Sequence, residues 1–329
     1  MGGFLSELGK KLAERWLSLL VLPGALYLAI AVTAHTLGHT RPFDLPLLTR
    51  QITTWANHPA TSNTDGYVVL LAATLAGAAA TRLVAQALGS LTERLCLAAD
   101  WHTWPPPLRR LAARQTARRH DRWTRAARTW HHHREQDAQA LAHGRRADPA
   151  ARRAAERTMT CIAPEEPTRP TWSGDRLNAA AVRLERDHHL DLATLWPHLW
   201  LILPEETRVQ ITTVRQNLTR AATLTAWALL YLPLAAWWWP AALITATLTL
   251  TGRARTRTAT DTYALLLEAA TRLHIRDLAD RLGLNPTSPT TPETGGALGL
   301  NSTGGPLTSE AGDILTRHLT PTPPPPPAG

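Results

Sequence analysis

The longest apolar stretch of the chain covers residues 221–252, which are 32 consecutive residues without a charged side chain. About 20 apolar residues suffice for one membrane-spanning helix. A single helix over this stretch would be about 48 Å long, against about 30 Å for the hydrocarbon core of a bilayer. Pro233 and Pro240 lie near its middle and interrupt a helix there. Together with the arginines that flank both of its ends, the pattern predicts a transmembrane hairpin over residues 219–252, with one tilted span or a re-entrant segment as the alternatives.

Two more apolar stretches precede this one and predict transmembrane helices over residues 16–38 and 67–90. The first is too long for the apolar part of a signal peptide, so we expect it to be retained. Residues 1–15 place their large apolar side chains on one helical stripe, which predicts an interfacial amphipathic helix. The fold class predicted is all-α, an integral membrane protein with about four transmembrane helices.

Arginine and lysine near the ends of the spans indicate the orientation. Lys10, Lys11 and Arg15 precede the first span, whereas residues 39–66 carry only two arginines. We therefore expect residues 39–66 to form an extracellular loop and residues 91–218 to form a basic helical domain in the cytoplasm. Arginines also flank both ends of the hairpin, so both termini are predicted to be cytoplasmic. Arg outnumbers Lys 33 to two, which is typical of a GC-rich bacterial genome and indicates a bacterial cytoplasmic membrane.

Several side chains are candidates for the membrane interface. Indole rings favour the headgroup layer, and arginines near a span end can extend their guanidinium groups to it. The candidates are Trp16, Trp237, Trp238, Trp239, Arg82, Arg220 and Arg253. Small residues four apart in the second span, such as Ala72, Ala76 and Ala80, would allow close helix contact within the chain or in a homo-oligomer.

Residues 107–157 hold 14 Arg and five acidic residues, a net charge of +9 that equals that of the whole chain. The prolines at 105–107 and Gly144 bound a predicted helical hairpin. Its arginines are candidates for contact with an anionic surface, for which lipid headgroups are favoured over nucleic acid. These residues are Arg109, Arg110, Arg114, Arg118, Arg119, Arg122 and Arg125.

The remaining segments predict further helices and a tail. Ser173 is a candidate N-cap, with Asp175 in the first turn of its helix. Residues 253–283 predict a cytoplasmic amphipathic helix with three helical ion pairs, Arg257/Asp261, Glu268/Arg272 and Asp277/Arg281. Residues 284–329 are rich in Pro, Thr and Gly, which predicts a disordered tail in which only residues 309–319 could form a short helix.

No catalytic motif is found, and we predict neither an enzyme nor a bound cofactor or metal. Consecutive histidines at 131–133 point about 100° apart on a helix and cannot chelate one ion together. Asp187, His188, His189 and Asp191 form a better grouping for a metal but lack an identified third ligand. The phosphate-binding and hydrolase motifs are missing.

Several strings resemble those of uncharacterised actinobacterial multi-pass membrane proteins. They are Thr171–Arg176 (TWSGDR), Trp196–Trp200 (WPHLW), Leu203-Pro204, Trp237–Pro240 (WWWP) and Asp261–Tyr263 (DTY). The resemblance covers about residues 1–283 and implies membrane localisation, without an activity.

The function predicted is a membrane anchor or scaffold, embedded in the lipid bilayer, whose cytoplasmic domain recruits a protein partner. One alternative is an oligomeric pore or membrane-disrupting effector that uses the hairpin of residues 219–252. A second alternative is membrane-tethered nucleic-acid binding through residues 107–157, although a nucleic-acid partner is disfavoured.

Overall fold

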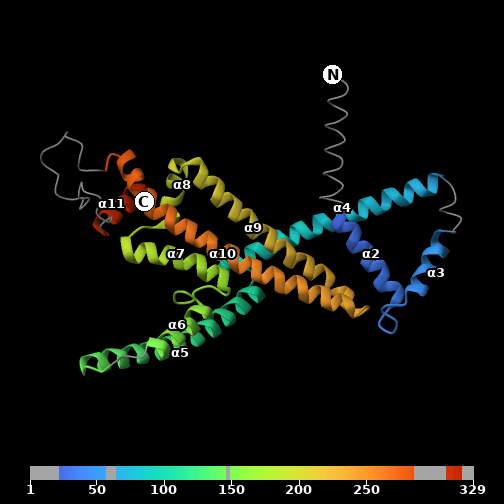
Figure 1. Ribbon diagram of the computed structural model, residues 1–329. Coiled ribbons are helices and arrows are strands. Elements are labelled where there is room, and N and C mark those ends of the chain that lie inside the picture. The colour runs from blue at the N-terminus through green and yellow to red at the C-terminus, as the bar shows by residue number, and fades with distance from the viewer. Residues whose placement is uncertain (1–21, 57–63, 146–148, 285–308, 321–329) are drawn as a thin grey trace, which may run out of the picture. The chain divides into compact units, whose positions relative to one another are not determined.

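The computed structural model describes residues 22–56, 64–145, 149–284 and 309–320 (Figure 1). These residues are mostly helical and include no β-strand, so the all-α prediction is confirmed. They divide into two compact units. Unit 1 takes its described residues from Met1–Glu93 and Leu218–Thr256, and unit 2 takes them from Arg94–Asn217 and Arg257–Gly329. The predicted interfacial helix over residues 1–15 lies outside the described residues.

The long uncharged stretch forms a helical hairpin in unit 1. Helix α9 (Glu205–Tyr231) ends before the first proline, the 3-10 turn η3 (Pro233–Ala236) follows, and α10 (Pro240–Arg281) begins at the second proline (Figure 1). Proline suits the first turn of a helix because it needs no N–H partner there. A Cβ on Gly252 of α10 would lie 2.7 Å from Thr225 Oγ1 of α9, so the two arms pack closely.

Helices α2 (Leu22–Leu37) and α4 (Thr64–Leu97) also meet through a glycine in unit 1. A Cβ on Gly24 would lie only 2.1 Å from the carbonyl oxygen of Ala78. The two backbones therefore touch, as they do where small residues pack transmembrane helices. A Cβ on Gly77, one position after Ala76 on α4, would lie 3.3 Å from the side chain of Leu28. At Gly24 and Gly77, the small residues allow close contact between two helices of the same chain.

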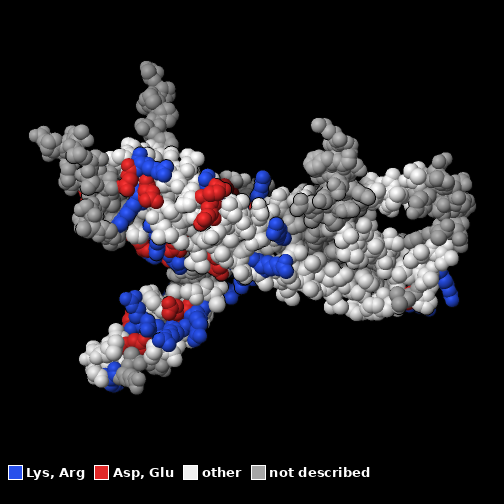
Figure 2. All heavy atoms as spheres, turned by 45° about the horizontal axis from the view of Figure 1, so that its top comes forward, with Lys and Arg blue, Asp and Glu red and all other residues white. Residues whose placement is uncertain are grey.

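The outer surface of unit 1 is largely apolar. Many large apolar side chains on α4 and in the hairpin are exposed, among them Val69, Leu70, Leu83, Leu229, Leu243 and Leu250. Figure 2 shows few charged groups over the face of this unit in view. Within the described ranges one helix, Val68–Leu97, is long and apolar enough to cross a membrane, and Leu22–Leu37 is apolar but shorter. The prediction of four transmembrane spans therefore stays a prediction.

The turn of the hairpin packs on the segment that follows α2. Trp238 Nε1 donates to the carbonyl oxygen of Pro42 at 3.0 Å, and Phe43 meets Trp239 edge-on with ring centroids 5.8 Å apart. His39 Nδ1 lies 2.6 Å from the carbonyl oxygen of Trp237. The predicted loop over residues 39–66 also contains a helix, α3 (Leu45–Ala56).

Unit 2 includes the predicted basic hairpin, formed by α5 (Pro106–Ala142) and α6 (Pro149–Ile162). Gly144 follows α5 with φ +65°, a left-handed conformation that glycine adopts without strain. An ion pair between Arg152 and Asp137, 3.0 Å apart, joins the two helices.

The main core of unit 2 combines α7 (Trp172–His188), α8 (Leu192–Ile202), the second part of α10 and α11 (Ser309–Leu319). Leucines from each of these helices are buried together: Leu184, Leu195, Leu278 and Leu315. Because α10 continues to Arg281 without a break, the predicted boundary at residue 252 is not the end of a helix.

Helix α11 is an ordered part of the segment predicted as a disordered tail. A Cβ on Gly312 would lie 1.8 Å from the carbonyl oxygen of His188, and Thr316 donates to the carbonyl oxygen of His189 at 3.1 Å. His189 Nδ1 pairs with Asp313 at 3.0 Å. The short helix predicted over residues 309–319 is thus present and packed on unit 2. The prediction of disorder for residues 285–308 and 321–329 lies outside the described residues.

Candidate functional site

The predicted membrane-interface residues differ in exposure. Trp237 and Trp239 are exposed at the hairpin turn, whereas Trp238 is half-buried against the segment after α2. Arg220 and Arg253 are exposed, one on each arm, and Arg82 is half-buried on α4. Trp16 lies outside the described residues. The exposed members have the solvent-facing positions that an interface role requires.

Six of the seven arginines predicted to contact an anionic surface are exposed along α5: Arg109, Arg110, Arg114, Arg118, Arg122 and Arg125. Figure 2 shows basic groups gathered on α5 and α6, with fewer acidic ones among them. Arg119 differs from the others. Its side chain is 13% exposed and pairs with Asp175, so it is not available to a surface. The interpretation of Arg119 as a surface residue is corrected accordingly.

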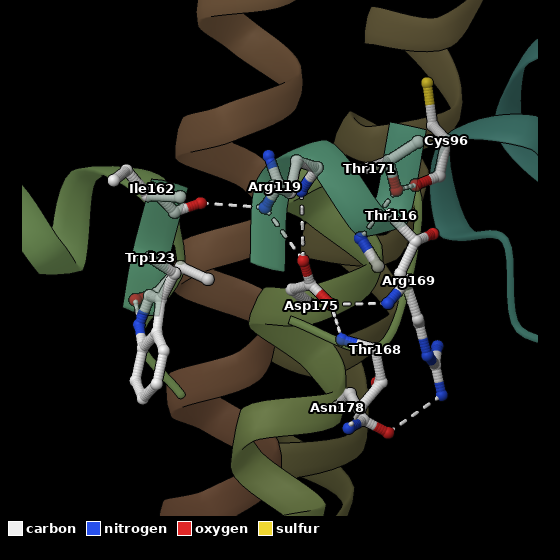
Figure 3. A network of polar contacts seen from close by, with 12 residues as sticks. Cys96, Thr116, Arg119, Trp123, Ile162, Thr168, Arg169, Thr171, Asp175 and Asn178 are labelled. Carbon is white, nitrogen blue, oxygen red and sulfur yellow. Dashed lines mark hydrogen bonds and ion pairs between the residues drawn. The ribbon is translucent and has the colours of Figure 1, made fainter. Parts of the chain in front are cut away.

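Asp175 is the centre of a polar network in unit 2 (Figure 3). Its side chain is 2% exposed. One carboxylate oxygen accepts from Arg119 Nε and Nη2 at 3.3 and 2.8 Å. The other accepts from the backbone N–H groups of Thr168 and Arg169 at 3.0 and 2.8 Å. Arg119 Nη2 also donates to the carbonyl oxygen of Ile162 at 2.7 Å. The network thereby joins α5, the end of α6 and the start of α7.

Two residues of the TWSGDR string, Thr171 and Gly174, form the start of α7 and its contact with the end of α4. Thr171, not Ser173, is the N-cap of α7, and its hydroxyl accepts from Gly174 N at 3.1 Å. The same hydroxyl donates to the carbonyl oxygen of Cys96. A Cβ on Gly174 would lie 2.6 Å from the carbonyl oxygen of Leu97, so only glycine permits this approach. The string is therefore needed to attach α7 to the end of α4.

The next arginine of the string links α7 to α10. Arg176 Nε donates to Asp261 Oδ1 at 2.6 Å, and Arg257 lies over the ring of Trp172, 5.2 Å from its centroid. The predicted helical pair Arg257/Asp261 is thus replaced by two contacts with α7. Of the other two predicted pairs, Glu268/Arg272 is present at 3.0 Å, whereas Asp277 pairs with His274.

Burial shifts the pKa values of two charged groups in this network, Asp175 and Arg169. Desolvation raises the pKa of Asp175 above its usual value, against the effect of the hydrogen bonds from Arg119 and the backbone. Desolvation likewise lowers the pKa of Arg169, which the nearby carboxylates of Asp175 and Asp100 oppose. Because the buried Asp175 carboxylate is engaged by Arg119 and two backbone N–H groups, the network stabilises the junction of α5, α6 and α7. Asp175 does not line an open cleft, where a titrating group could act on a ligand.

A separate cavity of about 560 Å³ opens on unit 2 between α8, α9 and α10. Its walls include Trp196 and Trp200 from α8, Ile211 and Arg215 from α9, and Tyr263 from α10. The two indole rings are 5.9 Å apart, and the Arg215 guanidinium lies 5.9 Å from the centroid of the Tyr263 ring. The WPHLW and DTY strings therefore supply most of the aromatic wall. The two strings are more than 60 residues apart in the chain, and only the packing of α8 against α10 brings them together.

The histidine groupings do not assemble a metal site. Among the described residues, no three His, Cys, Asp or Glu side chains are placed to hold one ion. His189 pairs with Asp313, while Asp191 caps α8 by accepting from Ala193 N at 3.0 Å. Asp187 lies 3.4 Å from both Arg186 and Arg272. These acidic and imidazole groups serve helix ends and ion pairs.

No family profile, curated protein or solved structure matches this chain. The resemblance to actinobacterial membrane proteins stays a prediction. Residues from each of the strings TWSGDR, WPHLW and DTY take part in contacts within unit 2.

Proposed function

We propose that the protein is an integral membrane anchor whose helical unit 2 recruits a protein partner at the membrane surface. One observation carries this proposal: α4, α9 and α10 each continue without a break from the apolar unit 1 into the charged unit 2. A set of helices that is apolar and small-residue-packed at one end and charged at the other suits a chain that leaves a bilayer to form a cytoplasmic body.

The exposed surface of unit 1 supports the membrane part of the proposal. Exposed Val and Leu side chains cover α4 and both hairpin arms, and a soluble protein rarely exposes so many large apolar groups together. In the proposed topology, α2, α4 and the two arms of the hairpin cross the bacterial cytoplasmic membrane. The arginines that follow α4 and flank the hairpin then face the cytoplasm, as positive charge near span ends generally does.

A matched pair of substitutions tests this placement. Leu75, near the middle of the predicted span, is 38% exposed, and Leu273 in unit 2 is 73% exposed. Leu75→Arg would cost about 2.5–3.5 kcal/mol of membrane insertion at a helix centre. We expect Leu75→Arg to lower the labelling of a cysteine introduced at position 53, in the predicted extracellular loop, by a membrane-impermeant maleimide in whole cells, and Leu273→Arg to leave that labelling unchanged. Equal behaviour of the two variants would exclude α4 as a membrane span.

The arginine face of α5 is the surface that best suits recruitment next to an anionic membrane. Leu108 and Leu111 are exposed among its arginines, at 46% and 65%, so the face offers both apolar contact and charge. A photoreactive amino acid at position 111 should give one reproducible protein adduct in native membranes, and Arg114→Glu should weaken it. A matching probe at position 273 is the control. Adducts that are equal at both positions, or missing from both, would contradict partner recruitment by α5.

A further inference from the structure

The cavity between α8, α9 and α10 has the chemistry of a site for an amphiphile. Of the eight residues that line it, Arg215 alone is charged, and the rest are aromatic, aliphatic or, for Thr212, a hydroxyl. Its volume of about 560 Å³ is within the range of small-molecule pockets. A mostly apolar wall with a single cation suits a ligand that has one anionic group and a hydrocarbon part.

Arg215 is held in a geometry that favours an oxyanion. Its guanidinium lies over the ring of Tyr263, a cation–π contact that restricts the side chain. A guanidinium donates within its own plane and pairs well with two oxygens of one phosphate. The apolar wall extends from Trp196 to Trp200 and on to Leu201, which is 76% exposed. A hydrocarbon chain lying along this wall would cover an apolar surface that now faces outward.

The position of the cavity along α9 identifies the source of such a ligand. Arg215 lies five residues before Arg220, the last charged residue before the uncharged stretch, which is roughly 7.5 Å along the helix. The headgroup layer on each side of a bilayer is about 5–7 Å thick. If the hairpin crosses the membrane, Arg215 therefore lies at the level of the lipid phosphates, and Ile211 and Thr212, which precede it on α9, lie farther from the bilayer.

We propose that this cavity binds a phospholipid of the membrane, with the phosphate on Arg215 and one acyl chain turned out of the bilayer to lie along Trp196, Trp200 and Leu201. The inference rests on the proposed membrane placement and adds to it a specific lipid site. Bound in this way, a lipid joins α8 and α10 to α9 at the membrane surface, and unit 2 is held there by more than the spans alone.

Photoreactive lipids test the site in the full-length protein reconstituted into nanodiscs. One probe is a phosphatidylglycerol with a diazirine in its acyl chain, and the other is the diacylglycerol with the same chains and no phosphate. After irradiation and digestion with trypsin, adducts are counted on residues 187–208, which carry the α8 wall, and on residues 83–94 of α4, which serve as the membrane reference.

We expect the phospholipid to label residues 187–208 more than the diacylglycerol does, while both label residues 83–94 equally. A charge-assisted contact is worth about tenfold in affinity. Arg215→Gln should therefore reduce phospholipid labelling of residues 187–208 by about tenfold, Arg215→Lys should restore part of it, and Arg128→Gln on α5 should have no effect. Circular dichroism of each variant shows whether it folds.

The diacylglycerol probe and the α4 peptide of residues 83–94 distinguish a failure of the lipid site from a failure of the membrane placement. Labelling of residues 83–94 without any preference for phosphate on residues 187–208 would overturn the lipid site and leave the membrane placement standing. Missing label on residues 83–94 would overturn the membrane placement, and the lipid site with it. The comparison of the two probes on the wild-type protein needs no variant, so a poorly folded Arg215→Gln does not prevent a decision.

Discussion

The two units differ in where their large apolar side chains lie. Glycines allow close contacts between elements in both units, at Gly24 and Gly252 in unit 1 and at Gly174 and Gly312 in unit 2. In unit 1, however, many large apolar side chains point outward. In unit 2, leucines fill the interior and a buried carboxylate, Asp175, joins three helices. A leucine core forms where water surrounds the molecule, because burial removes apolar surface from water. Large apolar side chains that point outward suit lipid tails, which are as apolar as they are. This contrast is the physical basis for the proposal that unit 1 lies in the bilayer.

The largest expected effect of a single change is on the network of unit 2. Asp175→Ala leaves the buried Arg119 guanidinium without its anion and two backbone N–H groups without an acceptor. Removing one partner of a buried pair costs about 3–5 kcal/mol. Hydrogen exchange should therefore rise throughout α5, α6 and α7. Asp121→Ala, an exposed change on α5, is the control, and equal exchange in both variants would exclude Asp175 as a support of the fold.

The next effect concerns the helix of the tail. Gly312→Val would place a side chain against the carbonyl oxygen of His188, so α11 should leave unit 2 and expose Leu315. Losing one buried leucine costs about 1.5–3 kcal/mol. Limited proteolysis should then cut within residues 309–319, whereas Glu310→Val, at an exposed position of the same helix, should stay protected. Protection of the glycine variant would show that α11 does not depend on this contact.

Close packing in unit 1 is tested by a pair of glycines. Gly24→Val would push α2 away from the backbone of Ala78, at a cost of about 1–3 kcal/mol for overpacking. Gly77→Ala meets only the mobile end of Leu28, 3.3 Å away, and should be close to neutral. Thermal unfolding of the full-length protein in detergent measures both. Similar melting temperatures for the two variants would contradict direct backbone contact between α2 and α4.

A smaller effect is expected at the exposed arginines of α5. Each arginine near an anionic lipid surface contributes about fivefold to its binding. A cysteine at position 115 should react with a water-soluble maleimide more slowly in phosphatidylglycerol nanodiscs than in phosphatidylcholine nanodiscs. Arg114→Gln should reduce that difference, whereas Arg152→Gln, which removes an ion pair to Asp137, should not. If the rates do not depend on lipid charge, the arginines serve another partner, and protection by added DNA would point to nucleic acid.

The smallest effect is expected at an exposed ion pair. Arg186 is 58% exposed and pairs with Glu165 at 3.1 Å and with Asp187 at 3.4 Å. Pairs of this kind contribute about 0–1 kcal/mol because water and salt screen them. Arg186→Gln should change the midpoint of urea unfolding of unit 2 only slightly, and less still at high salt. If Arg186→Gln lowers the free energy of unfolding as much as Asp175→Ala does, then an exposed ion pair stabilises this fold as strongly as a buried one.

Local sequence patterns predicted much of the helical architecture. The two prolines of the uncharged stretch mark the turn between α9 and α10, and Gly144 marks the end of the α5 segment. The pattern also predicted the short helix of the tail. These features depend on residues close together in the chain, because proline and glycine act on their own backbone and helical periodicity spans only a few residues.

The candidate sites were less predictable because their residues come from distant parts of the chain. Arg119 has the same local sequence as the surface arginines around it, and only its pairing with Asp175, 56 residues away, removes it from the surface. The aromatic cavity needs Trp196, Arg215 and Tyr263 together, from three helices. Asp175 at the start of α7 was predicted, yet its four donors could not be.

Short-range periodicity, charge and backbone restriction were enough to predict the helical fold, the apolar and basic segments and the turn of the hairpin. The tertiary structure alone decided which arginine is buried, where α11 packs and which aromatic rings share a cavity. Those outcomes depend on which helix faces meet, and that choice is made by the packing of side chains far apart in the chain.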